Sequence, residues 1–256
     1  MSYSLDTEYL IRYGGQKMTQ MHSFQDKVAQ MLILNEGVRI SHFEYQGKRY
    51  WLKQVEKLSG AMRFLKSDSA EALYKETQVL KLLQNDGAPV PKVHASGDGY
   101  LVVEDAGRTV RDWLESDDIA SDELQRILND TSKGLAHLHL MDHAHGRPAL
   151  RDISWDAGEV KFIDFEANQQ KGTLLNQQIR DVLVYVHSLY RYINDKEKIS
   201  AAIKAYRQAG GEVIWQQAKQ FLQSWQWLYY FAKPFQGIGG KDLKPVYWVL
   251  WHFRYH

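Results

Sequence analysis

The chain has 256 residues, which suits one large domain or two small lobes that share a cleft. Its 32 basic and 31 acidic residues give a net charge of +1, so overall charge offers no case for nucleic-acid binding. It contains no cysteine, which excludes disulfides and thiolate zinc sites and fits a reducing compartment. Because the polar start at 1–15 lacks a signal-peptide core and no run of about 18 apolar residues occurs, we expect a soluble, cytoplasmic protein.

The first half of the chain predicts a small lobe that mixes strands with one helix. The segments 38–45 and 48–55 are rich in β-branched and aromatic residues, and Gly47 marks a hairpin turn between them. Next, 67–87 places apolar residues at helical spacing, with Ser and Asp as caps at its start and a glycine at its end. A short strand, a Gly-Asp-Gly turn and a strongly apolar strand at 100–104 follow.

The second half of the chain is mainly helical. We predict helices at 110–116, 121–141, 176–193, 198–210 and 212–232, and in 121–141 the apolar residues recur at spacings of three and four. Between these helices, 154–162 is typical of a β-hairpin whose turn is Asp156, Ala157 and Gly158. Because the composition changes near 104–109, we predict an α+β protein with an N-terminal lobe at 1–104 and a C-terminal helical lobe at 105–256.

The C-terminal segment 221–256 is packed with aromatic residues, and most of its charged residues are Lys or Arg. One or two helices of the protein core would explain this composition. A surface that lies against a membrane would also explain it, because Trp and Tyr together with basic residues favour the lipid headgroup zone.

Lys53 and Glu76, two charged residues of the N-terminal half, indicate a function only as a pair. Lys53 stands in a strand among apolar and aromatic neighbours, and Glu76 stands in the helix that follows. A lysine in a strand or a glutamate on a helix usually faces solvent. A lysine held by a glutamate, however, can grip the phosphates of a nucleotide as a positioned point charge.

Two acids of the C-terminal half are separated by the predicted hairpin. Asp164 directly follows the apolar run "KFI", and Asp152 lies in the polar loop "HGRPALRDISW". The hairpin between them can bring both carboxylates to one place. Carboxylate oxygens are hard donors, and Mg²⁺ is commonly held by one or two of them together with phosphate oxygens.

These features occur in the order found in the protein-kinase-like phosphotransferases, and the chain resembles their aminoglycoside-phosphotransferase and lipopolysaccharide-kinase branch. The resemblance spans about residues 30 to 190 and is carried, in order, by "YWLKQ", "YKETQVLKLL", "YLVVEDAG", "LAHLHLMDHAHGRPALRDISW", "KFIDFE" and "QQIRDVLVYVHSL". It implies a bilobal fold with a small β-rich N-lobe and a larger, mainly helical C-lobe.

The resemblance also implies roles for individual residues. ATP would be bound by Lys53, its partner Glu76, the hinge at Glu104 and the loop at Gly37, and Mg²⁺ by Asp164 and Asp152. His145 would brace the catalytic loop, and Asp181 would anchor its backbone. The loop before Lys53 departs from the family pattern, because it offers a single glycine where several are usual.

A second departure is Arg147, which stands where the family has its catalytic aspartate. An arginine cannot accept the proton of a substrate hydroxyl, since its pKa lies above about 12. In one interpretation Asp152 orients the acceptor or shares the metal, and Arg147 steadies the transferring phosphoryl group. In the other interpretation the protein is a nucleotide-binding pseudokinase or scaffold.

We therefore expect an ATP- and Mg²⁺-dependent kinase that acts on a hydroxyl of a small molecule or a glycan. The connection "EANQQKGTLLNQQ" after Asp164 is too short for a peptide-docking segment. By family analogy, the aromatic and basic tail is compatible with a lipopolysaccharide-core sugar as the acceptor and with a peripheral contact with the inner membrane. His137, His139 and His143 favour a zinc site only weakly, because no HExxH pattern is present.

Overall fold

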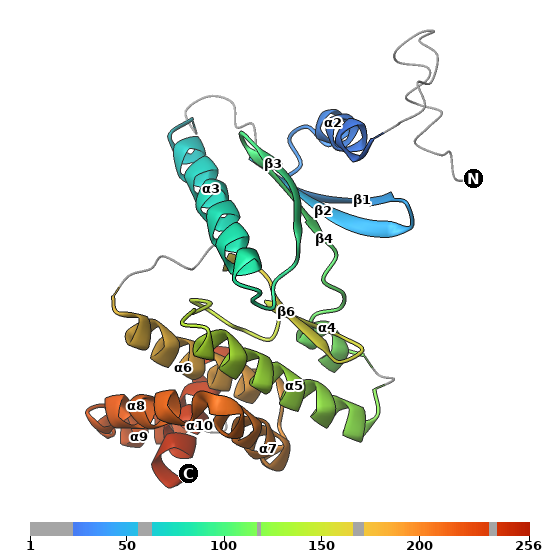
Figure 1. Cartoon of the computed structure of the whole chain (residues 1–256). Coiled ribbons are helices and arrows are strands. Elements are labelled where there is room, and N and C mark those ends of the chain that lie inside the picture. Colours follow the sequence, from blue (N-terminus) through green and yellow to red (C-terminus); the bar gives the residue numbers. More distant parts are fainter. Residues whose placement is uncertain (1–22, 56–62, 117–118, 166–171, 236–239) are drawn as a thin grey trace, which may run out of the picture.

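The computed structural model describes residues 23–55, 63–116, 119–165, 172–235 and 240–256. A β-rich part comes first along the chain and a helical part follows, as Figure 1 shows. The helices are α2 (Phe24–Leu34), α3 (Arg63–Asn85), α4 (Val110–Leu114), α5 (Ser121–Leu140), α6 (Leu174–Tyr192), α7 (Lys196–Tyr206), α8 (Glu212–Gln223), α9 (Trp227–Ala232) and α10 (Gly240–Tyr255). The strands are β1 (Ile40–Tyr45), β2 (Lys48–Gln54), β3 (Val93–Gly97), β4 (Tyr100–Glu104), β5 (Ile153–Asp156) and β6 (Glu159–Phe162).

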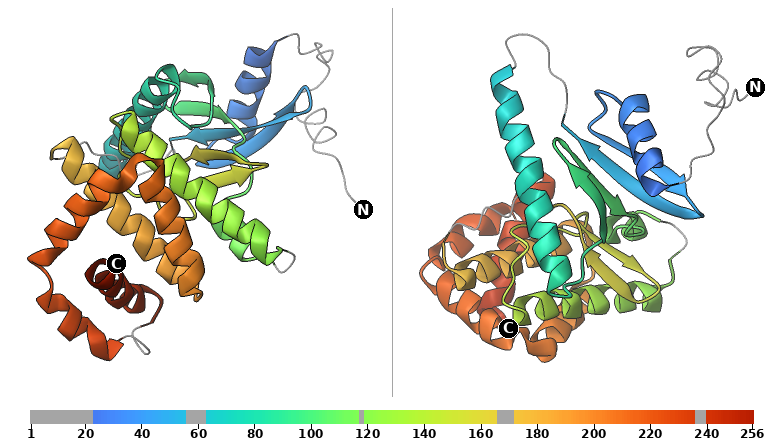
Figure 2. Two further views of the ribbon diagram at one scale, coloured as in Figure 1. Left: turned by 60° about the horizontal axis from the view of Figure 1, so that its bottom comes forward. Right: turned by 45° about the horizontal axis from the view of Figure 1, so that its top comes forward.

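The first four strands form one antiparallel sheet in the order β1-β2-β4-β3. The predicted hairpin turn is confirmed: Gln46 and Gly47 both have positive φ, which suits a two-residue turn between twisted strands. Helix α2 covers one face of the sheet through Val28, and α3 covers the other, as Figure 2 shows. Alternate residues of β4 therefore face different neighbours, with Val102 toward α2 and Leu101 toward α3.

The helical part is built around α5 and α6, and the main hydrophobic core lies between them and the later helices. The predicted hairpin is present as β5 and β6, which pack on α5. Its turn contains Ala157 and Gly158, both with positive φ. This core also includes Leu80 of α3 and Leu101 of β4, so it crosses the predicted boundary between 1–104 and 105–256. The division into lobes at 1–104 and 105–256 stays a prediction, and residues 1–22 of the first lobe lie outside the described ranges.

Three features of the helices differ from the sequence prediction. Helix α2 was not predicted, and the helix placed at 67–87 begins one turn earlier, at Arg63, because good helix formers precede its expected caps. The single helix predicted at 212–232 is broken into α8 and α9. At the break, the N–H groups of Trp225 and Gln226 donate three residues back, and this turn lets Tyr229 pack on Tyr247 of α10.

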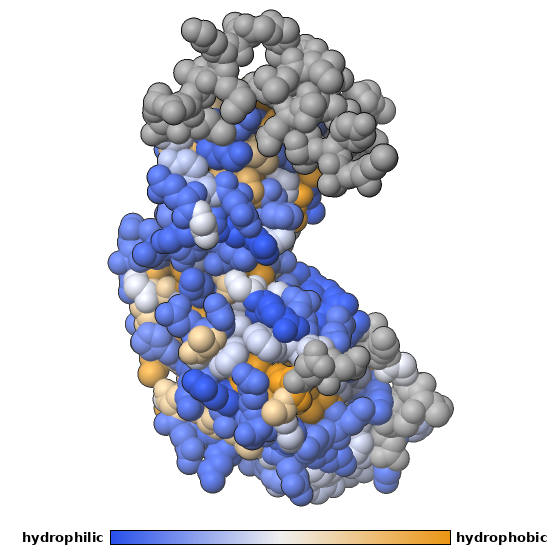
Figure 3. All heavy atoms as spheres, turned by 90° about the vertical axis from the view of Figure 1, so that its right-hand side faces the viewer, coloured by the Kyte–Doolittle hydropathy of each residue, from blue (hydrophilic) through white to orange (hydrophobic). Residues whose placement is uncertain are grey.

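The outer surface is polar over most of the face seen in Figure 3, and the molecule narrows between its β-rich and helical parts. Apolar residues gather there in small patches, mainly on the helical part. Among the described helices, none combines the length and the apolar character that crossing a membrane requires.

Candidate active site

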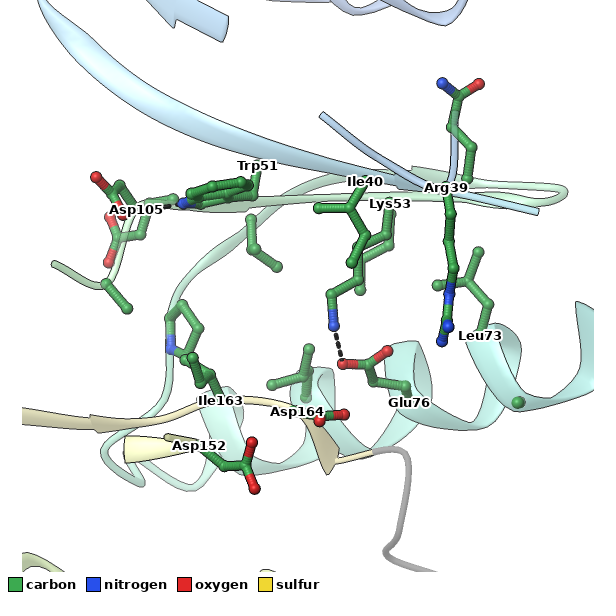
Figure 4. A pocket seen from close by; sticks show the side chains of 18 of the residues that line it. Arg39, Ile40, Trp51, Lys53, Leu73, Glu76, Asp105, Asp152, Ile163 and Asp164 are labelled. Carbon is green, nitrogen blue, oxygen red and sulfur yellow. Dashed lines mark hydrogen bonds and ion pairs between the residues drawn. The ribbon is translucent and has the colours of Figure 1, made fainter. Parts of the chain in front are cut away.

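A cavity of about 770 Å³ lies between the sheet, α3 and the two segments that carry Asp152 and Asp164. Trp51 and Lys53 line it from β2, because alternate residues of a strand face the same side, and Leu52 is buried against α2 instead. Figure 4 shows Lys53 reaching from the sheet to Glu76 of α3, with Asp164 close to Glu76 and Asp152 further below.

Lys53 and Glu76 form a short ion pair, with 2.6 Å between Lys53 Nζ and Glu76 Oε1. The Glu76 side chain is 5% exposed and the Lys53 side chain 23% exposed, so the carboxylate is buried while the ammonium reaches the cavity. The central position of β2 fixes the lysine, since Lys53 pairs with Ile40 on one side and Leu101 on the other. The pairing inferred from the sequence is thus present.

The loop that contains Arg147 is anchored by the buried carboxylate of Asp181. The N–H groups of His145 and Gly146 donate to its two oxygens over 2.6 Å and 2.8 Å. The His145 ring is fixed as well, because its Nε2 donates to the carbonyl of Ile163 (2.9 Å) and its Nδ1 accepts from the Arg147 N–H (3.2 Å). Burial lowers the pKa of His145, so this ring is a neutral brace that ties the loop to Ile163, between β6 and Asp164.

Arg147 reaches both acids of the cavity. Its Nε lies 3.8 Å from Asp152 Oδ2, and its Nη2 lies 3.5 Å from Asp164 Oδ2. Asp152 is buried and also faces Arg151, whose Nε is 3.5 Å from its Oδ1. Burial, and then the nearby charge of Asp164, raise the pKa of Asp152 to about 6 despite these arginines.

Asp164 has a left-handed backbone, with φ of 63°, which costs a residue other than glycine roughly 1–2 kcal/mol. The next residue, Phe165, holds this conformation in place. Its buried ring packs on the ring of His145, with 4.5 Å between the ring centroids. The fold therefore sustains a strained backbone at one of the acids of the cavity, a pattern that is frequent at functional sites.

Glu104 lines the cavity, whereas Gly37 is not among its lining residues. Glu104 lines the cavity at the end of β4, where burial favours a higher pKa but Lys161, 3.1 Å away, holds the pKa below its usual range. Gly37 lies in the turn between α2 and β1 with φ of 86° and no atom close to where a side chain would be. The cavity lining begins after it, at Arg39 and Ile40.

Three lining or neighbouring residues were missed by sequence reasoning. Arg39 enters the cavity beside Lys53, Trp51 donates to Asp105 (3.0 Å), and Lys161 pairs with Glu104. Trp51 could have been found, because strand alternation puts it on the same side of β2 as Lys53. Arg39 belongs to the predicted strand 38–45, but β1 begins only at Ile40, so strand alternation does not fix the direction of Arg39.

The histidines do not gather into one site. His139 bonds Tyr206 (2.8 Å) and approaches Asp181 (3.4 Å), while His143 bonds Asp86 (2.9 Å) at the end of α3. Within the described ranges no three His, Cys, Asp or Glu side chains form a metal-binding group.

Two carboxylates nevertheless suit Mg²⁺, which takes its remaining ligands from water and phosphate. Asp152 Oδ2 is buried and has no hydrogen-bond partner among the described residues, as expected for an oxygen meant for another ligand.

The sequence matches a known protein family and a relative of similar length. The model of the family described as "Phosphotransferase enzyme family" matches residues 44–228. An uncharacterized protein of Haemophilus influenzae is 37% identical over 225 residues, which cover 88% of this chain and 93% of that protein.

Two solved structures show a partial similarity to the chain. The structure of WaaP in complex with acyl carrier protein has a TM-score of 0.42 and 11% identity, covering 86% of this chain and 92% of that one. The bifunctional kinase-methyltransferase WbdD has a TM-score of 0.48 and 16% identity, covering 70% of this chain and 47% of that one.

Proposed function

Because the chain belongs to the phosphotransferase enzyme family, we propose that it transfers the γ-phosphoryl group of ATP to a hydroxyl of a small molecule or a glycan. The observation that carries the proposal is the layout of the cavity. The Lys53–Glu76 ion pair lines the same cavity as the carboxylates of Asp152 and Asp164. A polyphosphate bound among these side chains would contact the ammonium of Lys53. The carboxylates of Asp152 and Asp164 could hold its metal counter-ion.

Each of these groups has a role that its surroundings support. Lys53, oriented by Glu76, contacts the phosphates, and the end of β4 at Glu104 borders the space for the base. Asp164 and Asp152 would hold Mg²⁺, which when bound neutralises phosphate charge. His145 acts indirectly, because it fixes the loop that carries Arg147.

The proton of the acceptor hydroxyl needs a base other than Arg147. Asp152, which lines the cavity and faces Arg147, would either orient the acceptor hydroxyl or share the metal with Asp164. Arg147 then supplies positive charge for the group in transfer. Since the transition state of phosphoryl transfer is loose, positioning and charge contribute more than proton abstraction does.

The acceptor we favour is a sugar hydroxyl, such as that of a lipopolysaccharide core. The connection between Phe165 and α6 spans 166–173 and is short, although residues 166–171 lie outside the described ranges. A short connection leaves little chain for docking a peptide. The domain boundary at 104–105 would serve as the hinge between an N-terminal lobe that binds the nucleotide and a C-terminal lobe that binds the acceptor.

The test is Mg²⁺-dependent ATP consumption with a panel of sugars, using the wild type and single variants. Asp164→Ala is expected to abolish turnover, whereas Asp98→Ala, in the exposed turn between β3 and β4, leaves it unchanged. Asp152→Ala should lower turnover more than Arg147→Ala does. Wild-type turnover in Asp164→Ala contradicts the proposal, and equal losses at Asp152 and Arg147 contradict the role of Asp152.

A nucleotide-binding pseudokinase is the second candidate, favoured by the single observation that Arg147 occupies the position of the usual base. In that case ATP binds to the cavity, and Lys53→Met abolishes this binding, but no sugar or other hydroxyl acceptor supports ATP consumption. Calorimetric titration with a non-hydrolysable ATP analogue, run beside the turnover assay, separates the two functions.

We also propose that the C-terminal segment 221–256 makes a peripheral contact with an anionic membrane. Helix α9 exposes Trp227 (53%) and Phe231 (69%), whose rings lie 5.6 Å apart, while the aromatic residues of α10 are partly in the core. Between 213 and 256 the sequence has five basic residues and one acid: Lys219, Lys233, Lys241, Lys244 and Arg254 against Asp242. Exposed aromatic rings among basic residues suit the headgroup zone.

Vesicle co-sedimentation tests this contact. The wild type should bind vesicles of anionic lipid more strongly than neutral ones, and the double variant Trp227→Ser, Phe231→Ser should lose the binding. Tyr74→Ser removes an equally exposed aromatic ring from α3 and serves as the matched control. Equal sedimentation of the double variant and the control contradicts the proposal, and concentration-dependent dimers of the wild type would identify a second copy as the occupant.

A further inference from the structure

The guanidinium of Arg147 lies close to both carboxylates of the cavity, those of Asp152 and Asp164. Its contacts, 3.8 Å to Asp152 and 3.5 Å to Asp164, are longer than the ~2.7–2.9 Å of well-formed bonds between such groups. In the described part of the chain, Arg147 Nε and Asp152 Oδ2 are both buried without a hydrogen-bond partner. The guanidinium therefore balances the charge of the acids while leaving acceptor capacity on their oxygens unused.

The backbone of Arg147 is held in place, whereas its side chain is not enclosed. Its N–H donates to the His145 ring, and its carbonyl accepts from the N–H of Ala149 over 2.8 Å. The side chain, by contrast, is 40% exposed. The guanidinium can therefore leave the two acids through rotation of its own side chain, without a change in the loop.

We propose that Arg147 is a tethered competitor of the divalent cation at Asp152 and Asp164. Its guanidinium balances these acids when no metal is bound and leaves them when a metal enters. The inference rests on the proposed function, which places the metal at these two carboxylates. A divalent cation brings two positive charges next to the guanidinium, and like charges in a partly desolvated site repel strongly. Metal binding and the release of Arg147 are then one coupled event.

This competition has two consequences of opposite sign. Without metal, removing the Arg147 charge leaves two carboxylates facing each other and lowers the stability of the fold. With metal, the same removal deletes a competitor and raises the affinity. Arg151 provides a matched contrast, because it lies 3.5 Å from Asp152 Oδ1 but has no recorded contact with Asp164 among the described residues.

The experiment titrates Mn²⁺ into the full chain and measures free Mn²⁺ by electron paramagnetic resonance. Arg147→Gln should lower the Kd for Mn²⁺ about tenfold, which corresponds to about 1.4 kcal/mol, and Arg151→Gln should change it less than about threefold. Arg147→Lys, which keeps the charge, should stay near the wild type. In metal-free buffer Arg147→Gln should melt at a lower temperature than the wild type, and added Mn²⁺ should restore more of its stability.

Two results would overturn the inference, and they differ in what else they affect. If Arg147→Gln binds Mn²⁺ no more tightly than Arg151→Gln while Asp164→Asn abolishes binding, the metal site stands and the competition is wrong. If Asp164→Asn binds Mn²⁺ as the wild type does, these carboxylates do not hold the metal. The metal part of the proposed function then fails together with the competition.

Discussion

Replacing Asp181 with asparagine should weaken the anchor of the candidate catalytic loop and strongly lower the free energy of unfolding. Asp181 is fully buried and accepts the N–H groups of His145 and Gly146, one on each oxygen. Asparagine keeps the shape but replaces one oxygen with an NH₂ group, which then faces a backbone N–H. One charge-assisted bond is lost (about 1.5–3 kcal/mol), and one buried donor is left unsatisfied (about 1–3 kcal/mol). The expected loss is therefore about 3–5 kcal/mol.

Urea unfolding followed by tryptophan fluorescence measures this loss directly. Asp142→Asn is the control, because Asp142 is exposed near the same loop and has φ of 58°, a conformation that asparagine tolerates. The control should stay within about 0.5 kcal/mol of the wild type. A loss below about 1 kcal/mol for Asp181→Asn, or one equal to that of the control, would refute the anchoring role.

Three further predictions concern other parts of the molecule. Glu76→Gln should cost about 1–2 kcal/mol in urea unfolding, because it leaves the Lys53 ammonium without its counter-charge, and adding Lys53→Met should recover part of the loss. Burial holds the pKa of His252 at about 4 in the fold against about 6.5 when unfolded, so the unfolded chain binds more protons between these values. Stability should fall by up to about 3 kcal/mol as pH drops from 6.5 to 4, and His252→Gln should remove this part of the pH dependence. Gly211→Ala should lower stability by about 1–3 kcal/mol in thermal unfolding, because its Cβ would run into the ring of Tyr206.

The pairing of Lys53 with Glu76 was predictable because both positions follow from simple periods. Strand alternation fixes the side of β2 on which Lys53 lies, and the helical repeat of α3 fixes the direction of Glu76. The β5–β6 hairpin was predictable for a similar reason, since Ala157 and Gly158 form a turn between two alternating runs.

The contacts of Arg147 could not be predicted in this way. They depend on the path of a loop that Asp181 holds from α6 and that His145 ties to Ile163. A sequence shows that an arginine has replaced an acid. Only the folded loop shows that its guanidinium lies between two carboxylates.

The missed helix α2 and the missed break between α8 and α9 have a common physical cause. Helix α2 is short, and it packs on the sheet through Val28 and its neighbours, so tertiary contacts contribute where local signals are weak. The break between α8 and α9 likewise reflects a distant partner, because it lets Tyr229 stack on Tyr247. Neither partner is visible in the local pattern that predicts helices.

The central claim is that the cavity holds ATP with its phosphates between Lys53 and the two acids. A crystal structure with a non-hydrolysable ATP analogue and Mg²⁺ tests it most directly. The account predicts phosphate oxygens at Lys53 Nζ, a metal bound by Asp164, and the Arg147 guanidinium displaced from its contacts with Asp152 and Asp164. A nucleotide bound outside the cavity, or bound there with its phosphates away from Lys53 and Asp164, would contradict it.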